Sequence, residues 1–163
     1  MRTFVREASM LDCLGVFSRL GTDRGQTEIA QAQNIAGPYT PEKLAIMHYG
    51  ASATTVAFCS MAEPGRALAV AGFIRERAGV LRTWMFATDE AWEDYGTELT
   101  METLKGIEVA LETAHRIEAI CSDSRPQVHR WYARIGLTKE TTLRRYMADG
   151  SDAALFVRIR SDQ

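Results

Sequence analysis

The sequence predicts a mixed α/β fold, and two observations carry that prediction. Three strand-like runs rich in β-branched and apolar residues follow one another at residues 54–61, 67–74 and 80–87. A long amphipathic segment, about residues 92–115, comes directly after them. Because neighbouring strands joined by short polar turns are usually antiparallel, we expect a three-stranded meander followed by one long helix.

Before the meander, the chain predicts one strand and two or three helices. Residues 3–8 have a strand pattern, and Ser9 can cap a helix whose apolar residues recur from Met10 to Leu20. A second helical stretch is expected at residues 26–35. A third starts at Thr40 with Pro41 in the first helical position and runs to about residue 48.

After the meander, the long helix has an apolar stripe and a charged opposite face. The stripe consists of Leu104, Ile107, Leu111 and Ala114. A short buried strand is expected at residues 117–121, then a helix from residue 126 that Gly136 ends. Strands at 138–147 and 153–160 flank an Asp-Gly turn, which brings the sheet to about seven strands in one domain, residues 1–163.

Composition excludes several classes of protein. The chain has 163 residues, 46% of them hydrophobic and 25% charged, which is typical of one globular domain. Nineteen basic and 21 acidic residues give a net charge of −2, without the basic excess of a nucleic-acid-binding protein. No apolar run reaches the ~18 residues of a membrane span, and we expect no secretory leader. The three cysteines lack metal or redox spacing, so we expect free thiols and a cytoplasmic location.

The order of elements resembles that of the Gcn5-related N-acetyltransferase (GNAT) superfamily. The residue-level match is strongest at residues 128–137, where Tyr132 and Gly136-Leu137 fit the end of a late helix common in that superfamily. Arg125 replaces the asparagine that usually opens this motif. The resemblance covers nearly the whole chain and implies a mainly antiparallel sheet flanked by helices.

Three shorter blocks are similar to acetyltransferase-like proteins of short-tailed bacteriophages. The first consists of three short pieces at residues 23–24, 27–29 and 41–44, and the others lie at residues 83–89 and 129–131, in the same order as in that group. Some of its members are called internal virion or virion-assembly proteins. This resemblance implies a phage virion or a host protein as partner, and a location in the host cytoplasm or within a virion.

The GNAT resemblance also implies a place for acetyl-CoA. In active members, a glycine-containing loop between the fourth strand and the long helix binds the cofactor's pyrophosphate at the helix N-terminus. Here that loop would span residues 89–98, and Phe86, Ala87, Gly96 and Thr97 would lie beside the cofactor. The segment has one glycine, five acidic residues and no Lys or Arg. Because each like-charge contact costs about 1 kcal/mol, we expect acetyl-CoA to bind weakly or not at all.

Three residues are candidates for catalysis if the chain is an enzyme. Asp89 or Glu90 would accept a proton from an amine substrate. Alternatively, these acids belong to a solvated helix N-terminus or to a surface for a charged partner. The resemblance implies that Tyr132 protonates the leaving CoA thiolate, whereas a tyrosine near a helix end is also a common amphipathic core residue.

No metal site is expected, because the three histidines lack carboxylate or cysteine neighbours at ligand spacing. Arg125, Arg130 and Arg134 form either a solvated helix face or a contact for phosphate or an acidic partner. Three functions therefore stay open. They are a phage particle or assembly protein with a degenerate acyl-CoA loop, an active acetyl-CoA-dependent N-acetyltransferase acting on an amine of a host protein or small molecule, and a small-ligand binding module. The sequence leaves the oligomeric state open.

Overall fold

The computed structural model describes residues 2–20 and 40–161. The helix expected at residues 26–35 lies outside the described residues, as does most of the first phage-like block. None of the helices in the described residues is both long and apolar enough to cross a bilayer.

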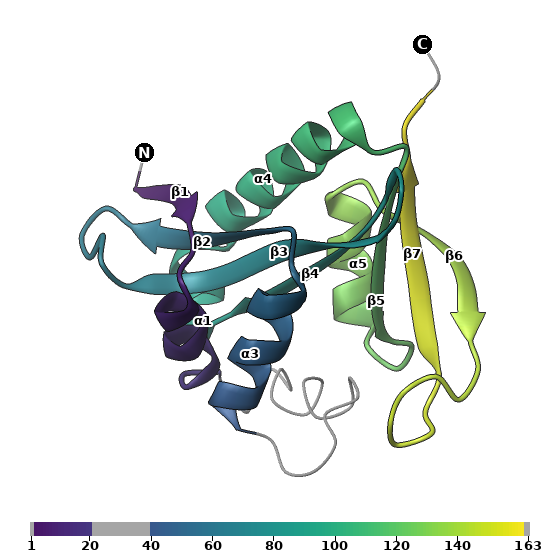
Figure 1. Ribbon diagram of the computed structural model, residues 1–163, viewed down its shortest axis with the longest axis horizontal. Helices are drawn as coiled ribbons and strands as arrows, with labels where there is room; N and C mark the ends of the chain where they lie inside the picture. Colours follow the sequence, from purple (N-terminus) through teal and green to yellow (C-terminus); the bar gives the residue numbers. More distant parts are fainter. Residues whose placement is uncertain (1, 21–39, 162–163) are drawn as a thin grey trace.

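Seven strands form one continuous sheet in the order β1-β2-β3-β4-β5-β7-β6 (Figure 1). Every neighbouring pair is antiparallel except β4 and β5, which confirms the mainly antiparallel sheet of about seven strands. The strands are β1 (Thr3–Glu7), β2 (Thr54–Ser60), β3 (Ala67–Arg77), β4 (Val80–Ala87), β5 (Arg116–Ser122), β6 (Thr138–Leu143) and β7 (Ala153–Ile159).

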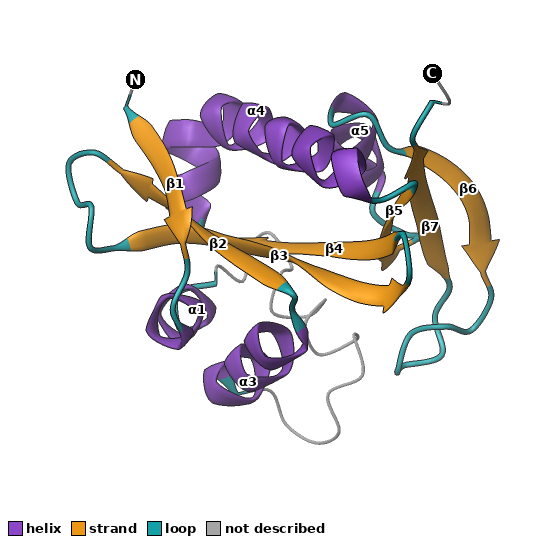
Figure 2. Cartoon of the chain, turned by 45° about the horizontal axis from the view of Figure 1, so that its top comes forward, coloured by secondary structure: helices purple, strands orange, loops and turns teal. Residues whose placement is uncertain are grey.

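Helices cover both faces of this sheet (Figure 2). On one face lie α1 (Met10–Phe17) and α3 (Pro41–Ala51), and on the other lie α4 (Asp89–Thr113) and α5 (Pro126–Arg134). The expected caps are present: Ser9 forms a capping box with Asp12, and the Thr40 side chain accepts a hydrogen bond from the Lys43 N–H. Helix α1 ends at Phe17, earlier than the apolar spacing to Leu20 indicated.

Two strand boundaries differ from the sequence-based expectation. Strand β3 continues through the polar residues to Arg77 because they pair with β4, where Arg75 faces Leu81 and Arg77 faces Val80. The turn is therefore confined to residues 78–79, and Gly79 supplies its positive φ of 73°. Strand β6 ends at Leu143 rather than near residue 147, and Arg145 then takes a left-handed conformation with φ of 51°.

The long helix begins earlier than expected, so the predicted cofactor loop at residues 89–98 is wrong as a loop. Thr88 caps α4 by accepting a hydrogen bond from the Ala91 N–H, and Asp89 and Glu90 lie in the first turn, where acids stabilise a helix. The helix is interrupted once, at Tyr95, whose φ of −135° and ψ of 16° are not helical. Residues 89–98 are thus two helical segments joined by a kink.

The stripe of α4 packs against the sheet as predicted. Ile107, Leu111 and Ala114 are buried with Ile117 and Ala119 of β5, whereas Leu104 is only half-buried. Glu108 on the opposite face is exposed and forms an ion pair with Arg158.

The opposite face of the sheet has its own core, in which His48 of α3 is surrounded by aromatic rings. Its ring centroid lies 4.7 Å from that of Trp84, 5.1 Å from that of Phe86 and 5.8 Å from that of Phe17. The side chain is nine-tenths buried, and neither ring nitrogen makes a hydrogen bond to a described residue. Burial in these apolar surroundings lowers the pKa of His48 to about 4.

Leu111→Ala should lower the free energy of unfolding by about 2–5 kcal/mol, because it leaves a cavity between α4 and β5. Val109→Ala is the matched control on the same helix, since Val109 is 63% exposed, and should change stability by less than about 0.5 kcal/mol. Urea denaturation measures both. Equal losses would mean that the faces of α4 are assigned wrongly.

Stability should fall between pH 6.5 and about 4 because His48 is buried in its neutral form. The unfolded chain binds this proton near pH 6.5 and the folded chain only near pH 4, so each step down in pH within that window favours unfolding. The total loss should be roughly 2–3 kcal/mol. In urea denaturations across this pH range, His48→Leu should flatten the slope and His115→Gln, at an exposed histidine, should keep it. An unchanged slope in His48→Leu would contradict the assignment.

Candidate functional site

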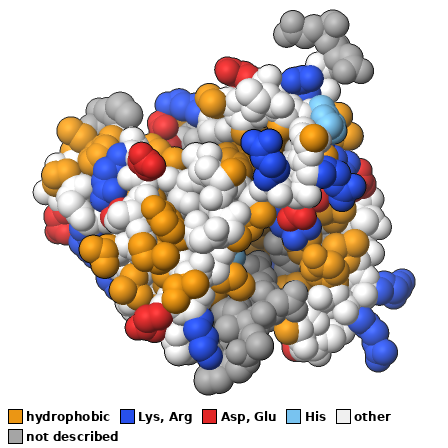
Figure 3. All heavy atoms as spheres, viewed as in Figure 1, with side chains coloured by type: hydrophobic (Ala, Val, Ile, Leu, Met, Phe, Trp, Pro, Cys, Tyr) orange, Lys and Arg blue, Asp and Glu red, His pale blue; other side chains and the backbone are white. Residues whose placement is uncertain are grey.

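A cleft lies between β4 and β5. The two strands pair at only three positions, Val80 with Arg116, Leu81 with Ile117 and Arg82 with Glu118, and then diverge. A cavity of about 1120 Å³ occupies the opening and is lined by residues from both faces of the sheet. We call this cavity the cleft, and Figure 3 shows a hollow bordered by hydrophobic side chains on one face of the molecule.

Four of the residues predicted for the site line the cleft. Phe86 of β4, Gly96 and Thr97 of α4, and Tyr132 of α5 all contribute to its wall. The structure therefore brings together a tyrosine and the kinked segment of α4 that are far apart in the sequence. Ala87 is fully buried beneath α4 and does not line the cleft.

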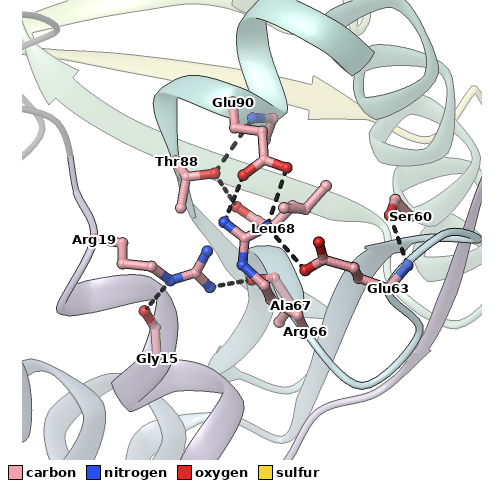
Figure 4. A network of polar contacts seen from close by, with 10 residues as sticks. Gly15, Arg19, Ser60, Glu63, Arg66, Ala67, Leu68, Thr88 and Glu90 are labelled. Carbon is pink, nitrogen blue, oxygen red and sulfur yellow. Dashed lines mark hydrogen bonds and ion pairs between the residues drawn. The ribbon is translucent and has the colours of Figure 1, made fainter.

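The two acids proposed as catalytic bases lie outside the lining of the cleft. Glu90 forms a two-point ion pair with Arg66, whose Nη1 and Nη2 atoms lie 3.2 and 2.6 Å from the two carboxylate oxygens (Figure 4). Arg66 also reaches Glu63 at 3.2 Å, which links the β2–β3 loop to the start of α4. Asp89 is half-buried in the same first turn. A catalytic role for either acid remains a prediction.

Arg2 binds the kink of α4. Its Nη2 atom donates to the Asp94 carbonyl oxygen at 3.0 Å, and its Nε and Nη2 atoms donate to Glu98 Oε1 at 3.0 and 2.7 Å. The guanidinium carbon lies 5.1 Å from the centroid of the Tyr95 ring. The hydrogen bond from Arg2 holds the pKa of Glu98 below its usual value. A residue from the start of the chain thus stabilises the helix break at the edge of the cleft.

The charge of the cleft differs from the charge of residues 89–98. Three acids of that segment line the cleft, Glu93, Asp94 and Glu98. Four arginines from other parts of the chain line it as well, namely Arg2, Arg82, Arg125 and Arg134. Among the described lining residues, positive charges therefore balance the acidic ones, which the local composition alone did not indicate. Arg130, by contrast, is exposed and does not line the cleft.

Tyr132 lies where α5 packs beside the cleft. Its ring centroid is 5.0 Å from that of Phe156 and 5.7 Å from that of Trp131, which hold the ring in place. Burial raises the pKa of the Tyr132 hydroxyl well above its ordinary value, so the group stays protonated at neutral pH. Within the described part of the chain, this hydroxyl has no hydrogen-bond partner. It can therefore donate a hydrogen bond to a molecule in the cleft.

Two tryptophans join α4 to α5 along the cleft. The Trp131 indole N–H donates to Thr100 Oγ1 at 3.0 Å, and the Trp92 and Trp131 rings meet edge to face with centroids 5.4 Å apart. Sequence reasoning did not single out these tryptophans, Arg2 or His48. Their contacts join residues 31 to 96 positions apart, so no local spacing indicated them.

The residues covered by the structure include no cluster of three or more His, Cys, Asp or Glu side chains that could hold a metal ion. All three cysteines are buried free thiols, as expected. Cys121 lies in the wall of the cleft, and burial raises its pKa to about 12, which makes its thiol unreactive at neutral pH.

No protein-family model and no curated protein matches the sequence. Solved structures match over nearly the whole chain. The ribosomal-protein-S5-alanine acetyltransferase of Vibrio fischeri has a TM-score of 0.71 and 15% identity, covering 99% of this chain and 95% of its own. A GNAT-family acetyltransferase of Bacillus anthracis has a TM-score of 0.70 and 16% identity, covering 98% and 95%.

A third match is AAC(6')-Ib in complex with ribostamycin and coenzyme A. Its TM-score is 0.72 at 16% identity, and the match covers 98% of this chain and 94% of that one. Identities this low establish a common architecture rather than a common activity. The chain therefore has the fold of the GNAT acetyltransferases.

Proposed function

We propose that this chain is a phage-encoded acetyltransferase-like protein that acts in the virion or its assembly, and that its acyl-CoA site is degenerate. The phage role is supported by the sequence blocks, of which residues 83–89 lie in the described structure at the end of β4 and the start of α4, and residues 129–131 lie in α5. The degenerate site is supported by the geometry of α4.

The contact of Arg2 with the kink is the main support for a degenerate acyl-CoA site. A helix N-terminus binds a diphosphate when its N–H groups and nearby cations are free to face it. At the first turn of α4, Thr88 already accepts the Ala91 N–H. At the kink, Glu98 holds the guanidinium of Arg2, and the Asp94 carbonyl accepts from it as well. A diphosphate would have to displace a carboxylate to reach this cation.

The rest of the cleft fits a CoA thioester better than the kink does. Its wall is largely apolar, Arg125 and Arg134 add positive charge, and Gly96 and Thr97 lie at the start of the second helical segment of α4. When bound, acetyl-CoA would supply the activated acyl group. This chain's own contribution would be to orient the thioester between β4 and β5 and to hold a proton at the Tyr132 hydroxyl.

The alternative function is an active N-acetyltransferase acting on an amine of a host protein or small molecule. The protonated, unpartnered hydroxyl of Tyr132 in the wall of the cleft favours it, because a leaving thiolate needs such a donor. A solved neighbour in complex with coenzyme A also supports this alternative. We place this alternative second because the two proposed bases, Asp89 and Glu90, do not line the cleft.

Isothermal titration of the full chain with coenzyme A and acetyl-CoA tests the degenerate site. The unmodified protein should bind weakly or not at all. Glu98→Gln should raise the affinity about fivefold, because it removes one like charge and frees Arg2. Glu102→Gln is the matched control one turn further along α4, since Glu102 pairs with Lys105 and does not line the cleft. Micromolar binding by the unmodified protein would overturn the degenerate site and place the enzyme first.

A separate experiment tests the phage role. In a host infected by the phage that carries this gene, mass spectrometry of purified particles and assembly intermediates should detect the chain, and deletion of the gene should lower the yield of infectious particles. Absence from both fractions together with a normal yield would contradict the role, whatever the titration shows.

A further inference from the structure

Helix α3 forms part of the wall of the cleft, and its attachment to the sheet depends on a histidine. Met47, His48 and Ala51 of this helix line the cleft. We propose that α3 is an acid-sensitive gate: when His48 takes up a proton, the helix leaves the sheet and opens the cleft, while the strands and α4 stay folded. The proposal concerns two states of the chain itself and does not depend on coenzyme A.

Three buried side chains of α3 attach it to its neighbours. The helix packs on α1 and on β3 (Figure 2), and its buried residues are Leu44, Ala45 and His48. Ile46, between them in the sequence, is 65% exposed. One of the three buried side chains is therefore titratable. A change in its charge alters a large share of the apolar contact that keeps the helix docked.

The surroundings of His48 suit a neutral ring better than a charged one. The rings of Phe17, Trp84 and Phe86 surround it, and neither ring nitrogen bonds to a described residue. Aromatic rings attract a cation, but they do not replace the hydrogen bonds that an imidazolium makes in water. The docked state therefore resists protonation. Once α3 is undocked, the imidazole meets water and takes up a proton near its ordinary pKa, so lower pH favours the undocked helix.

The charged groups on the neighbouring strands do not compensate a charge on His48. Arg82 of β4 lines the cleft with it and is itself a cation. The acids near Arg82 are engaged by arginines: Glu76 lies 3.2 Å from the Arg82 Nε atom, and Glu118, in register with Arg82, lies 2.7 Å from the Arg116 Nε atom. Among the described residues of these strands, the histidine therefore has no carboxylate of its own.

Helix α1 and the first turn of α3 do not compensate it either. Asp12 of α1 binds Arg6 through both carboxylate oxygens, at 2.7 and 2.8 Å. The hydrogen bond from Arg6 lowers the pKa of Asp12 to about 2, so this carboxylate stays ionised throughout the range in which His48 titrates. Glu42 and Lys43 lie in the first turn of α3 and are exposed, with one charge of each sign.

The core on the other face of the sheet does not respond to acid in the same way. Its wall includes Cys121 and Tyr132, and burial raises the pKa of both groups, so they are neutral at pH 7 and below. His129 is half-buried at the edge of this core, and its Nε2 atom lies 3.8 Å from a carboxylate oxygen of Asp123, which favours its charged form. Acid therefore weakens the α3 side of the sheet selectively.

The chain has a defined hinge where α3 ends. Ser52 leaves the helix in an extended conformation, and the next N–H, of Ala53, donates to the Phe73 carbonyl of β3 at 2.8 Å. Two bonds tie the end of the helix to the sheet: Ser52 Oγ donates to the His48 carbonyl at 2.6 Å and accepts from the Trp84 indole N–H at 2.8 Å. Undocking breaks the bond to Trp84 and leaves the pairing of β2 with β3 intact, so this indole reports on the gate.

Hydrogen exchange of the ¹⁵N-labelled full chain between about pH 6.5 and about pH 4.5 tests the gate. After correction for the intrinsic exchange rate, the protection of the helical amides of α3 should fall by up to about tenfold per pH unit. The Trp84 indole N–H should lose protection together with them, and the amides of β5 should keep theirs. Parallel losses in α3 and β5 would overturn the proposal, because the chain would then open as one unit. Constant protection in α3 would overturn it as well.

Three variants separate titration of the histidine from loss of packing. His48→Leu keeps an apolar side chain without a titratable ring and should remove the pH dependence of protection in α3. His115→Gln, at an exposed histidine, is the matched control and should keep it. Leu44→Ala removes a different buried contact of α3, so it should lower protection by the same factor at every pH and keep the slope.

If His48→Leu does not fold, His48→Phe takes its place with a ring that fits the same aromatic surroundings. A pH dependence that survives in either folded variant would contradict the gate. These measurements contain no coenzyme, so their outcome is independent of the titration that tests the acyl-CoA site.

Discussion

The divergence of β4 from β5 is the constraint on which the rest of the structure depends. Each strand is fixed to its outer neighbour along its length, β4 to β3 as far as Ala87 and β5 to β7 as far as Ser122. At the far end, the Thr88 N–H and hydroxyl both donate to the Leu68 carbonyl, and the Asp123 N–H donates to the Asp152 carbonyl. Both sides of the sheet are thus held away from the middle. Beyond Arg82, the edge of β4 next to β5 pairs with no strand among the described residues, and the cleft opens there.

This opening joins the two faces of the sheet into one continuous cavity, whose two sides differ in chemistry. On the α4 and α5 side, the cleft has a kinked helix, a protonated tyrosine and charges of both signs. On the α3 side, it has aromatic rings, a neutral histidine and an arginine at the rim. The alternation of side chains along one strand is enough to keep the two apart, since residues 84 and 86 face one way and residues 85 and 87 the other.

Periodicity in the sequence predicted most of the fold, because helix and strand patterns are local. It failed where a tertiary contact or a cap decided the outcome. The polar end of β3 is a strand because β4 pairs with it, and residues 89–91 are helical because Thr88 caps them. The sequence does contain a signal for this helix start, since a threonine followed by two acids is typical of a helix N-terminus. The resemblance to the GNAT superfamily nevertheless led to the prediction of a loop at residues 89–98.

The candidate site was less predictable than the fold for the same reason. Tyr132, Gly96 and Thr97 were predicted through the resemblance, and in the structure they line the cleft. Arg2 could not be found, since it reaches Glu98 across 96 positions of the chain. The charges counted over residues 89–98 in the sequence therefore did not predict the charge of the folded surface, to which arginines from other parts of the chain contribute. In the folded chain, two of the five acids of that stretch pair with arginines from elsewhere, Glu90 with Arg66 and Glu98 with Arg2.

Because these acids are paired, the position of Arg2, rather than the net charge of residues 89–98, decides whether the cofactor's diphosphate can bind at the kink. A bare acidic segment would repel any polyanion, but Glu90 and Glu98 are each neutralised by an arginine. What opposes a diphosphate at the kink is that the nearest cation is already engaged, by a carboxylate and a carbonyl in specific positions. An exposed ion pair of this kind is worth little in stability and can be exchanged. Substitution of Glu98 alone would therefore remove the carboxylate partner of Arg2 and leave that arginine, still bonded to the Asp94 carbonyl, more available beside a helix start, an arrangement that favours phosphate binding.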